Sequence, residues 1–288
     1  MANGTITFEM LDRPVINLIY AYFHHTCFCL TTVLMSIGIF VVYKKSPKEM
    51  GHYKYLLLYQ LVSVYAAELY YYMWRPINGF PYITIYPAGP FELLPAQAVI
   101  PTIYGVLALL VGIVHSLLIN LLFRVSQIFY NTTFYHLFNK PRDLLKLFLI
   151  SFVMFQFIVF VPFIGFFFHP YDYQVAIKTI TQEEPAYIEL IKQHPKFSGC
   201  DWSDSCQPFI TLAIIVYLPF TLFIIIMILA TYYLYYKQNQ FLKSMLIDRA
   251  SDLNNMLFRA LTIQYSLYLL LIIPSVILLE FGAFSRPK

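Results

Sequence analysis

Long stretches without a charged residue dominate the hydrophobic pattern of this chain. Six stretches are long enough to cross a bilayer, because a helix needs about 20 apolar residues to span the hydrocarbon core. The stretch between Lys54 and Arg75 contains one acid, Glu68. The predicted helices lie near residues 18–43, 55–74, 97–123, 145–168, 209–236 and 258–282.

The stretches predict an all-α fold, a polytopic transmembrane helix bundle that forms a single domain over residues 1–288. Only helices and closed barrels satisfy backbone polar groups in lipid. A barrel strand is about 10 residues long and alternates in hydrophobicity, whereas these runs are continuous. The first run is too long for a secretory signal and follows the acids Glu9 and Asp12. We therefore expect a retained signal anchor.

Composition supports the lipid bilayer as the main environment. Hydrophobic residues make up 59% of the 288 residues and charged residues 12%, against roughly 25% charged in soluble domains. Aromatic residues are abundant, with 27 Phe and 25 Tyr, and the net charge is only +4. These values exclude a soluble enzyme and a disordered regulator, and they give no reason to expect a nucleic-acid partner.

Lysine and arginine are concentrated in three short connecting segments, which hold four each when Arg259 at the end of the third is included. The other connections and the termini carry fewer basic residues over longer segments, and the acids cluster in 169–208. The positive-inside rule then predicts that the N-terminus is outside, and we expect the protein in the plasma membrane. The sequon at Asn3 would be glycosylated and the one at Asn131 would not. The predicted inner loops are 44–54, 124–146 and 237–257.

The cysteines form two pairs in different surroundings. Cys200 and Cys206 lie in the acidic outer loop, where an oxidising exterior favours a disulfide between them. Two free thiols, or pairing with another cysteine, is the alternative. Cys27 and Cys29 are two residues apart in the first helix and do not share a helix face, so we interpret them as packing residues.

Sequence motifs give no sign of catalysis. The chain has no GxxxxGK[ST], GxSxG or HExxH motif and no histidine cluster. We therefore expect no enzyme activity, no cofactor and no metal site.

Titratable residues near the outer ends of the predicted helices are the remaining clues, because polar groups in lipid are costly. Glu68 lies roughly 9 Å below the outer boundary, at 1.5 Å per helical residue. Three tyrosines share its helix face. We interpret the set as an outward-facing, aromatic-walled pocket for a small molecule. In the alternative, the histidines and Glu280 are solvated among headgroups, and the tyrosines form an aromatic belt. The candidate ligand-binding residues are Glu68, Tyr65, Tyr71, Tyr72, His24, His25 and Glu280.

The inner half of the third helix carries His115 and Asn120, which we interpret as interhelical hydrogen-bonding residues. Arg124 follows as a switch residue or a positive anchor. The basic inner loops suit a partner protein or anionic lipid. The candidate contact residues on that surface are Arg124, Lys140, Arg142, Lys237 and Lys243.

Short motifs resemble those of nematode serpentine chemoreceptors of the Str superfamily, classes H and I. The runs Lys45-Ser46-Pro47-Lys48-Glu49-Met50 and Tyr53-Lys54-Tyr55-Leu56-Leu57-Leu58 are similar to the TP-x-x-M … YK-x-x-LL signature after their first helix. Similar segments are Arg75-Pro76 with the loop Tyr86-Pro87-Ala88-Gly89-Pro90, and Leu261-Thr262-Ile263-Gln264 with Pro274. The resemblance implies a chemosensory G-protein-coupled receptor with a small external ligand and a heterotrimeric G protein as partner.

The helix count departs from that family, whose members have seven helices. The chain ends at Lys288 after the sixth predicted helix, without the Pro-Tyr-Arg ending of a seventh. We expect six visible helices of a seven-helix fold, and activity that needs a partner chain, in a homo- or hetero-oligomer, or a longer isoform. A truncated, non-signalling relic is one alternative. A small-solute transporter or channel is another, although the low glycine content (10 Gly) and the lack of an evident internal repeat speak against it.

Overall fold

The computed structural model describes ten parts of the chain and divides it into two compact units. Unit 1 is Met1–Ser116 with Ile150–Val216, and unit 2 is Leu117–Leu149 with Tyr217–Lys288. The predicted helix 258–282 lies outside the described residues. The described residues are 8, 12–46, 51–78, 83–95, 98–128, 132–168, 173–183, 185–194, 198–200 and 207–244.

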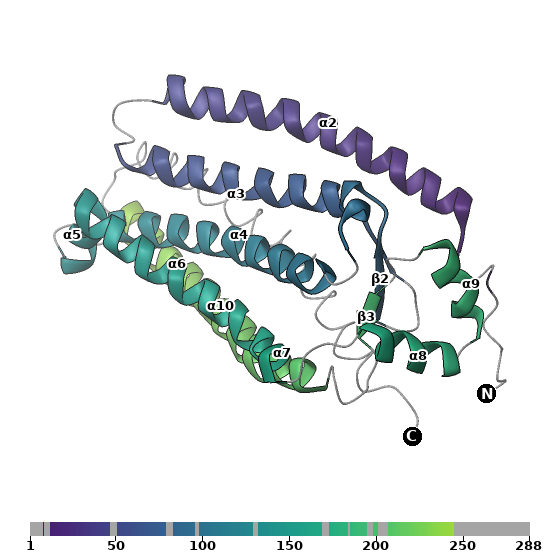
Figure 1. Ribbon diagram of the computed structural model, residues 1–288. Coiled ribbons are helices and arrows are strands. Elements are labelled where there is room, and N and C mark those ends of the chain that lie inside the picture. The colour runs from purple at the N-terminus through teal and green to yellow at the C-terminus, as the bar shows by residue number, and fades with distance from the viewer. Residues whose placement is uncertain are drawn as a thin grey trace. The chain divides into compact units, whose positions relative to one another are not determined.

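Two long helices run side by side in unit 1 (Figure 1). Helix α2 (Pro14–Lys45) begins at a proline, which tolerates the first helical turn because its missing N–H has no helical partner there. It covers the predicted span 18–43 and extends beyond both ends. Helix α3 (Tyr53–Trp74) covers the predicted span 55–74. It ends at Arg75, whose left-handed backbone (φ 41°) lets its N–H reach the Tyr71 carbonyl at 2.7 Å.

Three further helices pass through the regions of the predicted third, fourth and fifth spans. They are α4 (Val99–Ile128), α6 (Pro141–Phe163) and α10 (Gln207–Ser244), and each contributes one part to each unit. Helix α6 stops one residue after Pro162, and the four-residue helix α7 (Gly165–Phe168) follows. Pro162 lies in the last turn of α6, where it removes one backbone hydrogen bond of the helix.

Four helices within the described residues are long and apolar enough to cross a membrane: Pro14–Lys45, Ile100–Gln127, Pro141–Phe163 and Thr211–Leu234. The predicted all-α, polytopic membrane fold is confirmed. Helix α3 is long enough but is not among the four, because tyrosines, a glutamine and Glu68 lower its hydropathy.

A small antiparallel sheet lies beyond the C-terminal end of α3 in unit 1 (Figure 1). Its strands are β1 (Pro76–Asn78), β2 (Ile83–Pro87) and β3 (Ser198–Cys200), in the order β1-β2-β3. In the register, Ile77 faces Tyr86 and Cys200 faces Ile83. The sequence pattern did not predict this sheet.

Two short helices complete the sheet region, α8 (Tyr173–Glu183) and α9 (Ala186–Gln193), and the 3-10 helix η2 (Pro90–Leu93) follows β2. A hydrophobic core joins β2 to both helices. Its buried members are Tyr86, Ile180, Tyr187 and Leu190, with Phe8, Ile77 and Ile191 packed against them. The core therefore combines segments from far apart in the sequence.

Unit 2 has its own aromatic core. The short helix α5 (Thr133–Asn139) is capped at its start, because the backbone N–H of Tyr135 donates to the Thr132 hydroxyl at 3.2 Å. Its Phe138 is 1% exposed and makes edge-to-face contacts with Phe123 and Phe134, at centroid distances of 6.3 and 5.1 Å.

Candidate functional site

Helices α2 and α3 bring together all the candidate ligand-binding residues that the structure describes. His24 packs against two tyrosines, with ring-centroid distances of 4.5 Å to Tyr20 and 5.3 Å to Tyr71. A hydrogen bond of 2.8 Å joins Nδ1 of the next residue, His25, to the Tyr72 hydroxyl. The two histidines therefore contact tyrosines of α3, whereas Glu280 lies outside the described residues.

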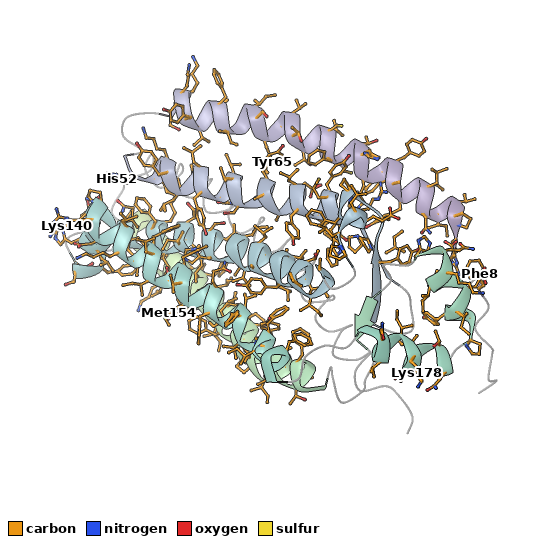
Figure 2. The ribbon with its side chains drawn as sticks, in the orientation of Figure 1. Phe8, His52, Tyr65, Lys140, Met154 and Lys178 are labelled. Atoms are coloured by element: carbon orange, nitrogen blue, oxygen red, sulfur yellow. The ribbon has the colours of Figure 1, made fainter. Side chains whose placement is uncertain are left out.

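An aromatic stack continues this contact along the two helices. The Phe28 ring lies parallel to Tyr72 at 4.1 Å and to Tyr65 at 6.4 Å. The Tyr65 hydroxyl lies 3.4 Å from the Thr32 hydroxyl, and Figure 2 shows Tyr65 between α2 and α3. We name the set His24, His25, Phe28, Tyr65, Glu68, Tyr71 and Tyr72, together with Tyr20, the α2–α3 cluster.

Glu68 is the acidic member of the α2–α3 cluster and is half-buried. Its carboxylate acts electrostatically on His24, as do Arg75 and His25. Within the described part of the chain, no hydrogen bond or ion pair reaches the Glu68 carboxylate. The His24 Nδ1 atom is likewise buried without a hydrogen-bond partner among the described residues. Two polar groups in this part of α2 and α3 therefore have no hydrogen-bond partner among the described residues.

The turn after α3 holds the sheet close to the α2–α3 cluster. The Arg75 guanidinium donates a hydrogen bond to the Ala88 carbonyl. Gly89 packs directly onto the end of α3, where a Cβ atom would collide with the Met73 carbonyl. The Tyr20 hydroxyl donates to the Pro76 carbonyl at 3.4 Å. The sheet is thus fastened to both helices.

Tyr86 is the buried centre of the sheet region, at 2% exposed. Its ring stacks on His194 at 4.1 Å, and its hydroxyl accepts a hydrogen bond of 3.5 Å from Asn17, whose amide also donates to Asp12. Burial, followed by the charge of Asp12, raises the pKa of Tyr86 to about 12. Tyr86 therefore keeps its proton at any physiological pH and ties the start of α2 to β2 and α9.

A second polar junction joins three helices of unit 1 around His115 of α4. Its Nδ1 lies 3.0 Å from the Tyr59 hydroxyl of α3, and its Nε2 lies 2.8 Å from the Ser151 hydroxyl of α6. Phe152 and Phe155 surround the ring at 5.6 and 5.2 Å. The predicted interhelical hydrogen bonding of His115 is confirmed.

The candidate contact residues of the inner surface all belong to unit 2. Arg124 is half-buried on α4, whereas Lys140, Arg142 and Lys237 are exposed. The backbone of Lys243 lies in the last turn of α10. The N-cap of α5 is Thr132, the middle residue of the predicted unmodified sequon at Asn131.

Two other predicted sites fall partly or wholly outside the described residues. The backbone of Cys200 belongs to β3, but Cys206 is not described, so the disulfide stays a prediction. The glycosylation site at Asn3 is not described either.

Sequence reasoning missed several partners of the cluster and of the junction. Tyr20 lies four residues before His24 on α2, and Phe28 and Thr32 lie four and eight residues after it. This helical spacing was the available signal. Tyr59 and Ser151 lie on helices other than that of His115. No local pattern identifies such partners.

The apolar helices and the buried polar junction between them define a polytopic α-helical membrane protein. The sequence model of one protein family, described as serpentine type 7TM GPCR chemoreceptor Srh, matches residues 17–286. The chain belongs to this family, which confirms class H among the two classes that the motifs resembled. No curated protein and no solved structure matches the chain.

Proposed function

We propose that this protein is a plasma-membrane chemoreceptor that binds a small external molecule at the α2–α3 cluster and activates a heterotrimeric G protein. Membership of a chemoreceptor family supports the receptor class. The observation that carries the site is the convergence of Glu68, His24 and Tyr71 at one end of two packed helices.

The composition of the α2–α3 cluster suits a small-molecule site. Such sites are mostly apolar and aromatic, with a few polar groups that fix the orientation of the ligand. Here the rings of Phe28 and the tyrosines supply the apolar wall. The buried Nδ1 of His24 and the carboxylate of Glu68 supply polar groups that a ligand can engage.

Orientation follows from the basic residues. With the N-terminus outside, the α2–α3 cluster faces the exterior, and the basic loops 44–54, 124–146 and 237–257 face the cytoplasm. Lys140, Arg142 and Lys237 are exposed, so they are accessible to the G protein or to anionic lipid.

A reporter assay tests the function. Cells that express the chain with a promiscuous G-protein α subunit are screened with a library of small volatile and water-soluble molecules. Glu68→Gln should change the response to an active molecule more than it changes surface expression. Glu92→Gln, at an exposed site in η2, is the matched control and should change neither. Solute flux in reconstituted vesicles without any G-protein response would support a transporter and contradict the proposal.

The number of helices is part of the proposal. Six predicted spans with the N-terminus outside place Lys288 outside, and a tag after Lys288 should then be reached by antibody on intact cells. A tag that is reached only after permeabilisation contradicts the six-helix topology.

A further inference from the structure

Glu68 stands out within the α2–α3 cluster as a half-buried carboxylate without a hydrogen bond or ion pair in the described part of the chain. A buried polar group without a partner is costly, and a buried charge more so. Acidic side chains inside membrane proteins consequently face one another, a cation or a ligand. A cation bound next to Glu68 would therefore compensate the charge of its carboxylate.

Two basic groups among the described residues, Arg75 and His24, do not fill this role. Arg75 lies two helical turns beyond Glu68, and its guanidinium donates to the Ala88 carbonyl. The His24 ring interacts with Glu68 electrostatically but forms no ion pair with it, and the ring instead packs between Tyr20 and Tyr71. With respect to the described residues, the carboxylate thus retains its capacity to bind a cation.

Aromatic rings surround the same position. Tyr65, Tyr71 and Tyr72 lie three or four residues from Glu68 and so share its helix face. Tyr20 approaches from α2 through its contact with His24. The face of an aromatic ring attracts a cation, and ammonium groups are recognised in proteins by such rings together with a carboxylate.

We propose that the ligand carries a protonated amine and that Glu68 is its counter-ion, with the tyrosine rings of the α2–α3 cluster around the ammonium group. This inference rests on the proposed function. It selects among ligand classes by charge: an anionic ligand is repelled by Glu68, and a neutral one leaves the carboxylate uncompensated. The buried Nδ1 of His24 is a second polar contact for the same ligand.

Binding is measured with purified full-length protein in lipid nanodiscs, by saturation-transfer NMR against matched probes. The probes are straight-chain and phenyl-substituted primary amines, the alcohols of the same carbon skeleton and the corresponding carboxylates. At least one amine should bind tenfold or more tightly than its alcohol and its carboxylate. Glu68→Gln should reduce that affinity at least tenfold, whereas the control Glu92→Gln should leave it unchanged.

Stability without ligand separates this role from a structural one. Because Glu68 lacks a partner in the described structure, Glu68→Gln should leave the melting temperature unchanged or raise it. A lower melting temperature for both Glu68→Gln and His24→Gln indicates a structural ion pair and overturns the proposal.

The remaining outcomes are also decisive. If no amine binds better than its alcohol, or if amine binding survives Glu68→Gln, the amine proposal is wrong. A neutral or anionic ligand that still requires Tyr71 or His24 leaves the proposed receptor site intact while excluding the amine class. A ligand response that no substitution in the α2–α3 cluster alters overturns both proposals.

Discussion

The junction around His115 allows a quantitative prediction about stability. The His115 side chain is 1% exposed, and each ring nitrogen has a hydroxyl partner on another helix, Tyr59 or Ser151. His115→Leu removes both hydrogen bonds and keeps most of the side-chain volume. Interhelical hydrogen bonds in membrane proteins contribute about 0.6 kcal/mol on average and about 1.7 at most. The substitution should therefore lower the free energy of unfolding by about 1–3 kcal/mol.

The assay is equilibrium unfolding in mixed lipid–detergent micelles, followed by circular dichroism. His115→Leu, Tyr59→Phe, Ser151→Ala and the two double variants give one double-mutant cycle for each hydrogen bond. The coupling energy in each cycle should be about 0.6 kcal/mol or more. His136→Leu provides the matched control, because His136 is exposed on α5. Its effect should stay within about 0.5 kcal/mol.

A coupling energy of zero in both cycles would refute the reasoning, since the three side chains would then contribute independently. An increase in stability for His115→Leu would do the same. That result would mean that the cost of burying the imidazole exceeds the benefit of its hydrogen bonds.

Three further predictions concern the sheet region and the topology. Gly89→Ala should lower the free energy of unfolding by about 1–3 kcal/mol, because the added methyl group meets backbone atoms. The control Gly112→Ala adds a methyl group that meets no atom within 4 Å, and it should be neutral or stabilising in the same unfolding assay. The raised pKa of Tyr86 means that the folded state keeps a proton that the unfolded state loses, so stability should fall as the pH rises from 10 to about 12. Tyr86→Phe should remove that alkaline loss, and equal pH dependence in both proteins would contradict it. Glycosylation mapping should find sugar at Asn3, and sugar at Asn131 instead would show an inverted topology.

The long helices could be predicted because one physical requirement governs them. A span needs a continuous apolar run, and such runs are visible in the sequence without knowledge of any tertiary contact. Their ends were less certain, because helices continue past the hydrocarbon core. Helix α10 runs to Ser244, eight residues past the predicted end at 236, since nothing in the polar segment that follows breaks a helix.

The sheet could not be predicted, because its formation depends on tertiary contacts and not on a local pattern in the sequence. Strands β1 and β3 are three residues long, too short to show an alternating pattern. Each pairs with β2, and β3 is separated from β2 by two long helices in the sequence. The packing of Tyr86 with α8 and α9 contributes to the arrangement, and that contact depends on tertiary structure.

The candidate site was predictable in part because α3 is polar for a membrane helix. Hydropathy alone does not identify α3 as a membrane span, although it has 22 residues, because its tyrosines, Gln60 and Glu68 lower the mean hydropathy. Such a helix is tolerated only if neighbouring helices shield its polar groups from lipid. The structure provides this shielding on two sides of α3.

Helix α2 contacts the side that bears Tyr65 and Tyr72, and the hydroxyls of Tyr59 and Tyr70 reach α4. In contrast, α2 buries none of its residues, all of which are described, and presents apolar side chains to lipid. The least hydrophobic of the long helices is therefore the one whose polar face carries the site.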